Sequence, residues 1–135
     1  MKKKNISNRF GSTTVELALT LPIFFLLLFG FYELSRANLI IHTAEAAAYE
    51  GARIGIIPGA TSAEVTDAVN AVLDTVAVNN AQVSVTPANL DTDSELVAVT
   101  VEINFGDNSS LIPQFIADST RFERTCELIR ELNEQ

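Results

Sequence analysis

One uncharged run near the start of the chain decides most of what the chain can fold into. Between Glu16 and Glu33 no residue carries a charge, and residues 17–32 are rich in Leu and Phe. A helix of these 16 residues is about 24 Å long, slightly less than the hydrocarbon thickness of a bilayer. A complete span therefore needs residues 13–15 as well, which places Glu16 inside the membrane. We expect a single transmembrane helix.

Charge is distributed very unevenly on the two sides of this run. Lys2, Lys3, Lys4 and Arg9 lie in the first ten residues, which contain no Asp or Glu. From residue 12 onward five Arg stand against 17 acidic residues, a net charge of −12. Basic residues favour the cytoplasmic side, so we expect a cytoplasmic N-terminus and an extracytoplasmic bulk. The acidic bulk argues against nucleic acid as a partner, because phosphate binding depends on Lys and Arg.

Three interpretations compete for the apolar run. An ordinary secretory signal needs small residues directly after it, but the first such pair, Ala44 and Ala46, comes a dozen residues later. A plain single-pass anchor leaves Glu16 unexplained, because a carboxylate costs about 2.5–3.5 kcal/mol at the centre of a membrane helix. In the third, a short basic leader ends at Gly11, the mature chain begins at Ser12, and Glu16 follows. This interpretation accounts for all these features.

The residues of the third interpretation resemble a known class of signals. Three lysines, Arg9-Phe10-Gly11 and then Ser12-Thr-Thr-Val-Glu16 before an apolar run are similar to the class III signals of type IV pilins and pseudopilins. Three features further resemble the TadE-like proteins of tight adherence (Flp) pilus systems: residues 11–22 with Pro22, Gly30 with Glu33, and residues 45–53 ending in Glu50, Gly51, Ala52 and Arg53. The resemblance covers residues 9–57. Tyr49 replaces a usual Arg, and Leu17 a frequent Phe.

The resemblance implies a structural subunit rather than an enzyme. It implies that a prepilin peptidase cleaves between Gly11 and Ser12 on the cytoplasmic face, and that the product is a minor pilin or pseudopilin. The implied partners are that peptidase, other pilin or pseudopilin subunits, the assembly platform and the membrane. Catalytic residues, a metal, a cofactor and a small-molecule substrate are not expected.

We expect the chain in the cytoplasmic (inner) membrane and, after assembly, in an extracellular pilus. The alternative is an uncleaved single-pass protein whose outer domain binds a ligand or partner.

Two residues of the span have a physical role in this scheme. After cleavage the new amine at Ser12 is one helical turn from Glu16, so in a filament the carboxylate meets the amine of a neighbouring subunit. The alternative is that Glu16 reaches the cytoplasmic headgroups of a simple anchor. Pro22 lacks an amide hydrogen and clashes with the carbonyl of Ala18, which predicts a kinked or loosened helix. The alternative is a tolerated membrane proline.

Beyond the span, the pattern predicts one helix from about residue 13 to about 56, ended by Pro58 and Gly59. The expected divisions are a leader at 1–11, a transmembrane segment at 12–33, an extracytoplasmic continuation of the helix at 34–57 and a small domain at 58–135. Small or apolar residues recur along the continuation and form a packing seam of Leu34, Ala37, Ile41, Ala44, Ala48, Gly51 and Gly55. The seam packs either on the chain's own domain or on adjacent subunits.

The domain itself is predicted from its turn and strand signals. Thr61 and Glu64 form a capping box that starts a second helix, which runs to about residue 77. Alternation predicts strands at 82–86 and 95–105, and a third strand at 116–126 precedes a short polar helix at 127–134. The fold class is therefore α+β: a long N-terminal transmembrane helix packed on a small antiparallel sheet, as in pilin-like subunits, with a second short helix.

Three further features do not predict a strong site. Asp91, Asp93 and Glu95 alternate as calcium ligands do, but Leu96 stands where the loop needs glycine, which favours a solvated loop. His42 is more readily a surface or interface residue than a ligand. Cys126 is expected to be buried in the last strand, or free to pair with another chain.

Overall fold

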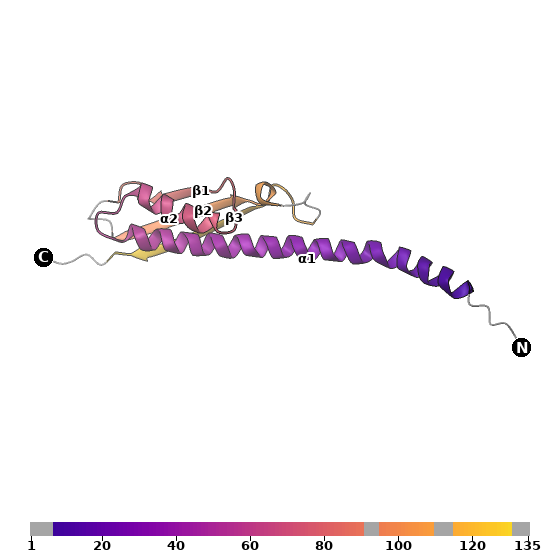
Figure 1. Cartoon of the computed structure of the whole chain (residues 1–135). Coiled ribbons are helices and arrows are strands. Elements are labelled where there is room, and N and C mark those ends of the chain that lie inside the picture. Colours follow the sequence, from indigo (N-terminus) through magenta and orange to yellow (C-terminus); the bar gives the residue numbers. More distant parts are fainter. Residues whose placement is uncertain (1–6, 91–94, 110–114, 131–135) are drawn as a thin grey trace, which may run out of the picture.

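A computed structural model describes residues 7–90, 95–109 and 115–130. In chain order the elements are α1 (Ser7–Gly55), α2 (Ser62–Asp74), β1 (Gln82–Thr86), β2 (Leu96–Asn104), the short 3-10 helix η1 (Gly106–Asn108) and β3 (Arg121–Ile129). A long helix lies along a small domain of two layers and extends well beyond it (Figure 1). The α+β class predicted from the sequence, with a long N-terminal helix and a short second one, is confirmed.

Helix α1 contains 49 residues, which corresponds to a length of about 73 Å. It begins at Ser7 rather than at residue 13, and it continues without interruption through Pro22, where we expected a kink or a loosened turn. The part that leaves the domain curves gently toward the N-terminus, whereas the part beside the domain is nearly straight (Figure 1).

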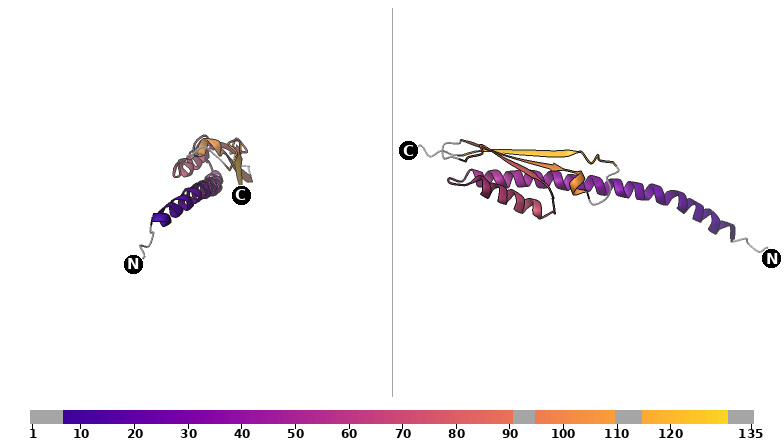
Figure 2. Two further views of the ribbon diagram at one scale, coloured as in Figure 1. Left: turned by 90° about the vertical axis from the view of Figure 1, so that its right-hand side faces the viewer. Right: turned by 90° about the horizontal axis from the view of Figure 1, so that it is seen from above.

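The sheet has the order β1-β2-β3, and both pairs of strands are antiparallel. Val99 of the central strand is the register partner of Val85 on β1 and of Cys126 on β3. Both helices cover the same face of this sheet, and the other face is uncovered by any described element (Figure 2). The predicted alternation of β2 is confirmed: every second residue is fully buried against the helices, namely Val97, Val99, Val101, Ile103 and, just past the strand, Phe105.

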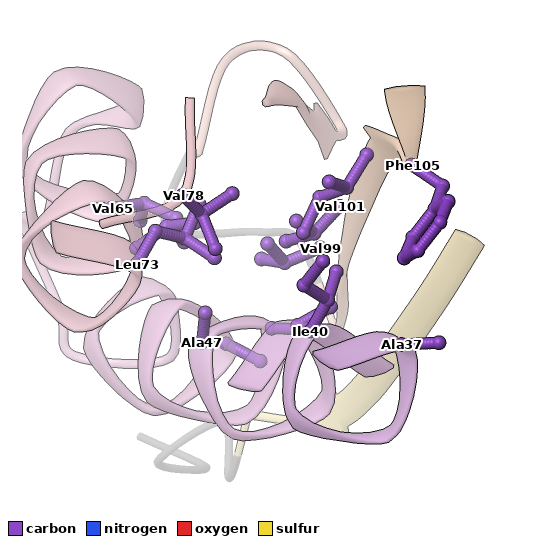
Figure 3. Packing of buried hydrophobic residues seen from close by; sticks show 14 of the residues in the cluster. Ala37, Ile40, Ala47, Val65, Leu73, Val78, Val99, Val101 and Phe105 are labelled. Carbon is purple, nitrogen blue, oxygen red and sulfur yellow. The ribbon is translucent and has the colours of Figure 1, made fainter. Parts of the chain in front are cut away.

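The core lies between this face of β2 and the two helices (Figure 3). Helix α1 contributes mostly alanines to it, with Ile40 as the one larger fully buried residue among those described. Helix α2 contributes Val65, Val69 and Leu73. Because alanine is small, α1 approaches α2 and β2 closely, and larger buried side chains such as those of Val65, Val99 and Phe105 fill the core between them.

The predicted start of α2 is confirmed in detail. Thr61 accepts a hydrogen bond on its hydroxyl oxygen from the amide of Glu64 at 3.3 Å, and the Glu64 carboxylate accepts one from the amide of Thr61 at 2.8 Å. The helix ends at Asp74, earlier than the predicted residue 77. Ala77 has a φ of 52°, which a helix cannot accommodate, so the chain turns there.

The C-terminal prediction was wrong in its boundaries. The strand expected at 116–126 begins at Arg121, and it continues to Ile129 through the first residues of the expected polar helix at 127–134. The physical reason is pairing: Leu128 and Ile129 lie opposite Val97 and Leu96, so the ladder with β2 holds this stretch extended. Residues 131–134 of that expected helix lie outside the described residues.

Candidate functional site

The first part of α1 carries its apolar side chains on an open surface. Between residues 11 and 32 the large apolar side chains are exposed, and none of them is buried against the domain. Within the described residues one helical stretch, Gly11–Gly55 of α1, is long and apolar enough to cross a membrane. Its most apolar 18 residues have a mean hydropathy of 2.1. Such a surface is unfavourable in water and favourable in lipid or against other apolar helices.

Ser12 and Glu16 lie on one face of this part of α1. The hydroxyl of Ser12 donates a long hydrogen bond of 3.4 Å to the carboxylate of Glu16, and both residues are exposed. Around Gly11 a Cβ would meet nothing within 4 Å. The two positions flanking the expected cleavage point are therefore open on the isolated chain.

Gly30 and Glu33 lie where the domain meets the exposed apolar part of α1. Glu33 is only 7% exposed, and its two carboxylate oxygens accept hydrogen bonds from the amides of Phe115 at 3.0 Å and Ile116 at 3.1 Å. A Cβ on Gly30 would lie 3.3 Å from the Phe115 ring, which is closer than most Cβ atoms in proteins approach another side chain. The pair thus fixes the segment that leads into β3 onto α1.

The last motif, Glu50 to Arg53, has one face toward solvent and one toward the core. Arg53 donates from Nε and Nη2 to the two carboxylate oxygens of Glu50 at 2.9 and 2.5 Å, and these bonds lower the pKa of Glu50 and raise that of Arg53. Gly51 and Ala52 are buried on the opposite side. Tyr49 is exposed.

The seam predicted along α1 divides into buried and exposed members. Ala37, Ala44, Ala48, Gly51 and Gly55 are buried, whereas Leu34 is exposed and Ile41 is half-buried. The two glycines pack on the chain's own α2 and β2: a Cβ on Gly51 would meet Val69 and one on Gly55 would meet Val97. Within the described residues these positions serve the domain's own core.

Two polar contacts of α1 were missed by sequence reasoning. Arg36 donates to the carbonyl oxygens of Asn108 at 3.0 Å and Val76 at 3.1 Å, and so joins α1 to the end of α2. Asn108 is itself buried and bonds the backbone of Asn79 in both directions. The second contact joins Arg130 to the end of α1. The one available signal was the scarcity of basic residues, which makes each Arg beyond residue 12 a candidate for a specific role.

The comparison with known families finds a match, and it lies in the N-terminal part of the chain. The family model for TadE-like protein matches residues 11–53. This segment is similar to TadE-like proteins. The TadE-like segment covers about a third of the chain and contains every motif from Gly11 to Arg53 described above. No curated protein and no solved structure matches the chain.

The remaining predicted positions lie outside the TadE-like segment or on its surface. His42 is exposed, with Nδ1 3.9 Å from a carboxylate oxygen of Glu45. Cys126 is half-buried on β3, and burial raises the pKa of its thiol. Asp91 and Asp93 lie outside the described residues, and Glu95 is exposed. Among the described residues no group of three or more His, Cys, Asp or Glu side chains is arranged to hold a metal ion.

Proposed function

We propose that the chain is a pilin-class structural subunit, a minor pilin or pseudopilin, of a tight adherence (Flp) pilus or a related secretion system. The observation that carries the proposal is the coincidence of two features. The TadE-like segment contains an apolar helix that extends beyond the domain, and the carboxylate of Glu16 directly precedes the uncharged run of that helix. A subunit of this form docks through its helix and needs no catalytic residue.

Processing is the first step of this proposal. The basic leader at 1–11 stays in the cytoplasm, the helix crosses the inner membrane once, and a prepilin peptidase cuts between Gly11 and Ser12. Glycine suits that position because a residue without a side chain lets the backbone enter a narrow cleft. The open space around Gly11 supports access by an enzyme.

Assembly is the second step. After cleavage the amine at Ser12 carries a positive charge one turn from Glu16, and the 3.4 Å contact between these residues supports their sharing of one helix face. A carboxylate inside the span is costly without a partner, so the Glu16 of one subunit pairs with the Ser12 amine of the next. Pro22 lies further along the same exposed stretch, where a missing backbone hydrogen bond lets the helix bend during packing.

Glu16→Gln separates assembly from targeting. The variant becomes more apolar, so it inserts and is cleaved like the parent, but it crosslinks and co-purifies far less with the other pilin components. Glu45→Gln, a change at an exposed position of the same helix, serves as the matched control and leaves association unchanged. Normal association of a cleaved Glu16→Gln protein would overturn the assembly role of this residue and favour a protein that is anchored in the membrane and presents its domain at the surface.

Gly11→Val tests processing independently. We expect this variant to accumulate at full length, whereas the parent begins at Ser12 when its N-terminal residue is determined. Equal cleavage of the two proteins would reject the assignment of residues 1–11 as a leader.

A further inference from the structure

An aromatic side chain of the domain lies against the membrane-spanning part of α1. The Phe115 ring packs on Gly30, and the backbone amide of Phe115 is held by the carboxylate of Glu33. The ring is nevertheless 56% exposed, and it borders an apolar groove whose other walls include Leu26, Leu27, Phe31 and Leu34. Apart from Glu33, the residues that line this groove are apolar.

The position of Gly30 in the span sets the depth of this groove. A span of about 20 residues that begins at residue 13 ends at residue 32. Gly30 then lies about 3 Å inside the outer boundary of the hydrocarbon, at a rise of about 1.5 Å per residue. The ring that packs on Gly30 therefore reaches the same level, on the extracytoplasmic side.

The backbone amides and the carboxylate next to the Phe115 ring are hydrogen-bonded to one another, as polar groups at the edge of a membrane must be. Backbone amides entering lipid must find a partner within the protein, and the amides of Phe115 and Ile116 both donate to Glu33. In return the Glu33 carboxylate, 7% exposed, is covered by that same segment. The contact thus satisfies two amides and one carboxylate at a depth where water is scarce.

We propose that Phe115 inserts its ring among the acyl chains of the outer leaflet, with the groove beside Leu27 and Phe31 filled by lipid. The groove is continuous with the lipid-facing surface of the span, which is why an acyl chain is its occupant. The domain is thereby held against the membrane surface at a fixed angle to α1. This inference rests on the membrane span of the proposed function, and it does not depend on processing or assembly.

The chain contains no Trp, so a single introduced Trp reports on one position. Three full-length variants, Phe115→Trp, Phe24→Trp and Tyr49→Trp, are placed in phosphatidylcholine vesicles with and without bromine on the acyl chains. Phe24 lies within the span and Tyr49 is exposed about 25 Å beyond its outer end, at about 1.5 Å per residue. We expect brominated lipid to remove most of the Trp emission at positions 115 and 24, and little at position 49.

The outcomes distinguish this inference from the proposed function. Quenching at position 24 but not at 115 would overturn the insertion of Phe115 and leave the span intact. Quenching of the Phe115→Trp variant by iodide in the buffer would place the introduced ring in water. Quenching by neither iodide nor brominated lipid would mean that a second protein chain covers the ring. Either result overturns the inference. Absence of quenching at position 24 would overturn the span and the inference together.

Because the Phe115→Trp change can disturb the fold, a second measurement uses the parent chain. It detects magnetisation transfer from lipid acyl protons to the Phe115 ring, and the absence of this transfer would also overturn the inference.

Discussion

Arg130 donates a hydrogen bond from Nη2 to the carbonyl oxygen of Gly55, the last residue of α1, at 2.7 Å. Its Nε donates to the carbonyl oxygen of Ile56 at 3.1 Å, and the residue is only 5% exposed. The last carbonyls of a helix lack partners within the helix, and a positive charge there is favourable. The residue that follows β3 therefore caps the helix that begins the chain.

Arg130→Met should destabilise the domain, because it leaves the carbonyls of Gly55 and Ile56 without this donor while keeping a long side chain. We expect a loss of about 1–3 kcal/mol in the free energy of unfolding. The matched control is Arg121→Met, which removes an exposed ion pair with Glu102 and should cost less than about 1 kcal/mol. Urea unfolding of the full chain in detergent measures both. Equal losses would contradict the capping role.

Gly51 is a position where α1 lies very close to α2 and β2 in the core. A Cβ at this position would lie 2.5 Å from Cγ2 of Val69 and 3.2 Å from Cγ1 of Val99. Gly51→Val should therefore overpack the core and lower the stability by about 1–3 kcal/mol. Ala46→Val places the same side chain at an exposed position of the same helix, and it is the control for a valine that meets no core neighbour. The same urea titration compares them, and a Gly51→Val chain as stable as the control would rule out the close contact.

The capping box of α2 predicts a pH dependence. The backbone amide and the hydroxyl of Thr61 donate to Glu64 and lower the pKa of its carboxyl below the ordinary 4.5. A carboxyl whose pKa is lower in the folded state stabilises that state above its unfolded pKa. This stabilisation is lost as the pH falls through the folded value.

Glu64→Gln removes this titration and should melt below the parent at neutral pH, with a difference that shrinks as the pH falls below about 4.5. Because every other carboxyl titrates in both proteins, the difference between their melting temperatures isolates Glu64. Glu123→Gln, an exposed change on β3, is the control for replacing a surface carboxyl by an amide. A difference that stays constant down to about pH 3 would contradict the prediction.

Much of this fold follows from local patterns in the sequence. The alternation of β2 and the capping box of Thr61 and Glu64 are short-range signals, and the structure reproduces both. The apolar run of α1 is equally local. These elements can be predicted because neighbouring residues determine them through strand or helix periodicity.

The errors arise where distant residues decide. Glu127 suggests a polar helix, but pairing of Leu128 with Val97 on β2 keeps this stretch in the sheet. Likewise the sequence marks Glu33 as a motif residue without indicating its partner, which lies 83 positions away at Ile116. Long-range hydrogen bonds leave no periodic pattern in the sequence, so the docking of the segment at Phe115 and Ile116 on α1 could not be predicted from it.

The bonds of Glu33 support a final prediction about this docking. Both carboxylate oxygens accept from backbone amides, so Glu33→Gln places an amide NH₂ against one of these donors. An unsatisfied buried donor costs about 1–3 kcal/mol, which corresponds to roughly 5- to 150-fold in an equilibrium constant. We expect the amides of Phe115 and Ile116 to exchange faster with deuterium by a factor in this range.

The exchange should change locally, because the fully buried residues around Val99 come from α1, α2 and β2, and Ile116 of the docked segment only packs against this core from outside. Glu45→Gln on the exposed face of α1 is the matched control and should leave the exchange at Ile116 unchanged. If Glu33→Gln accelerates exchange equally at Val99 and Ile116, the carboxylate supports the whole fold rather than the docking contact. If it accelerates neither, the two hydrogen bonds contribute nothing to holding the domain on the span.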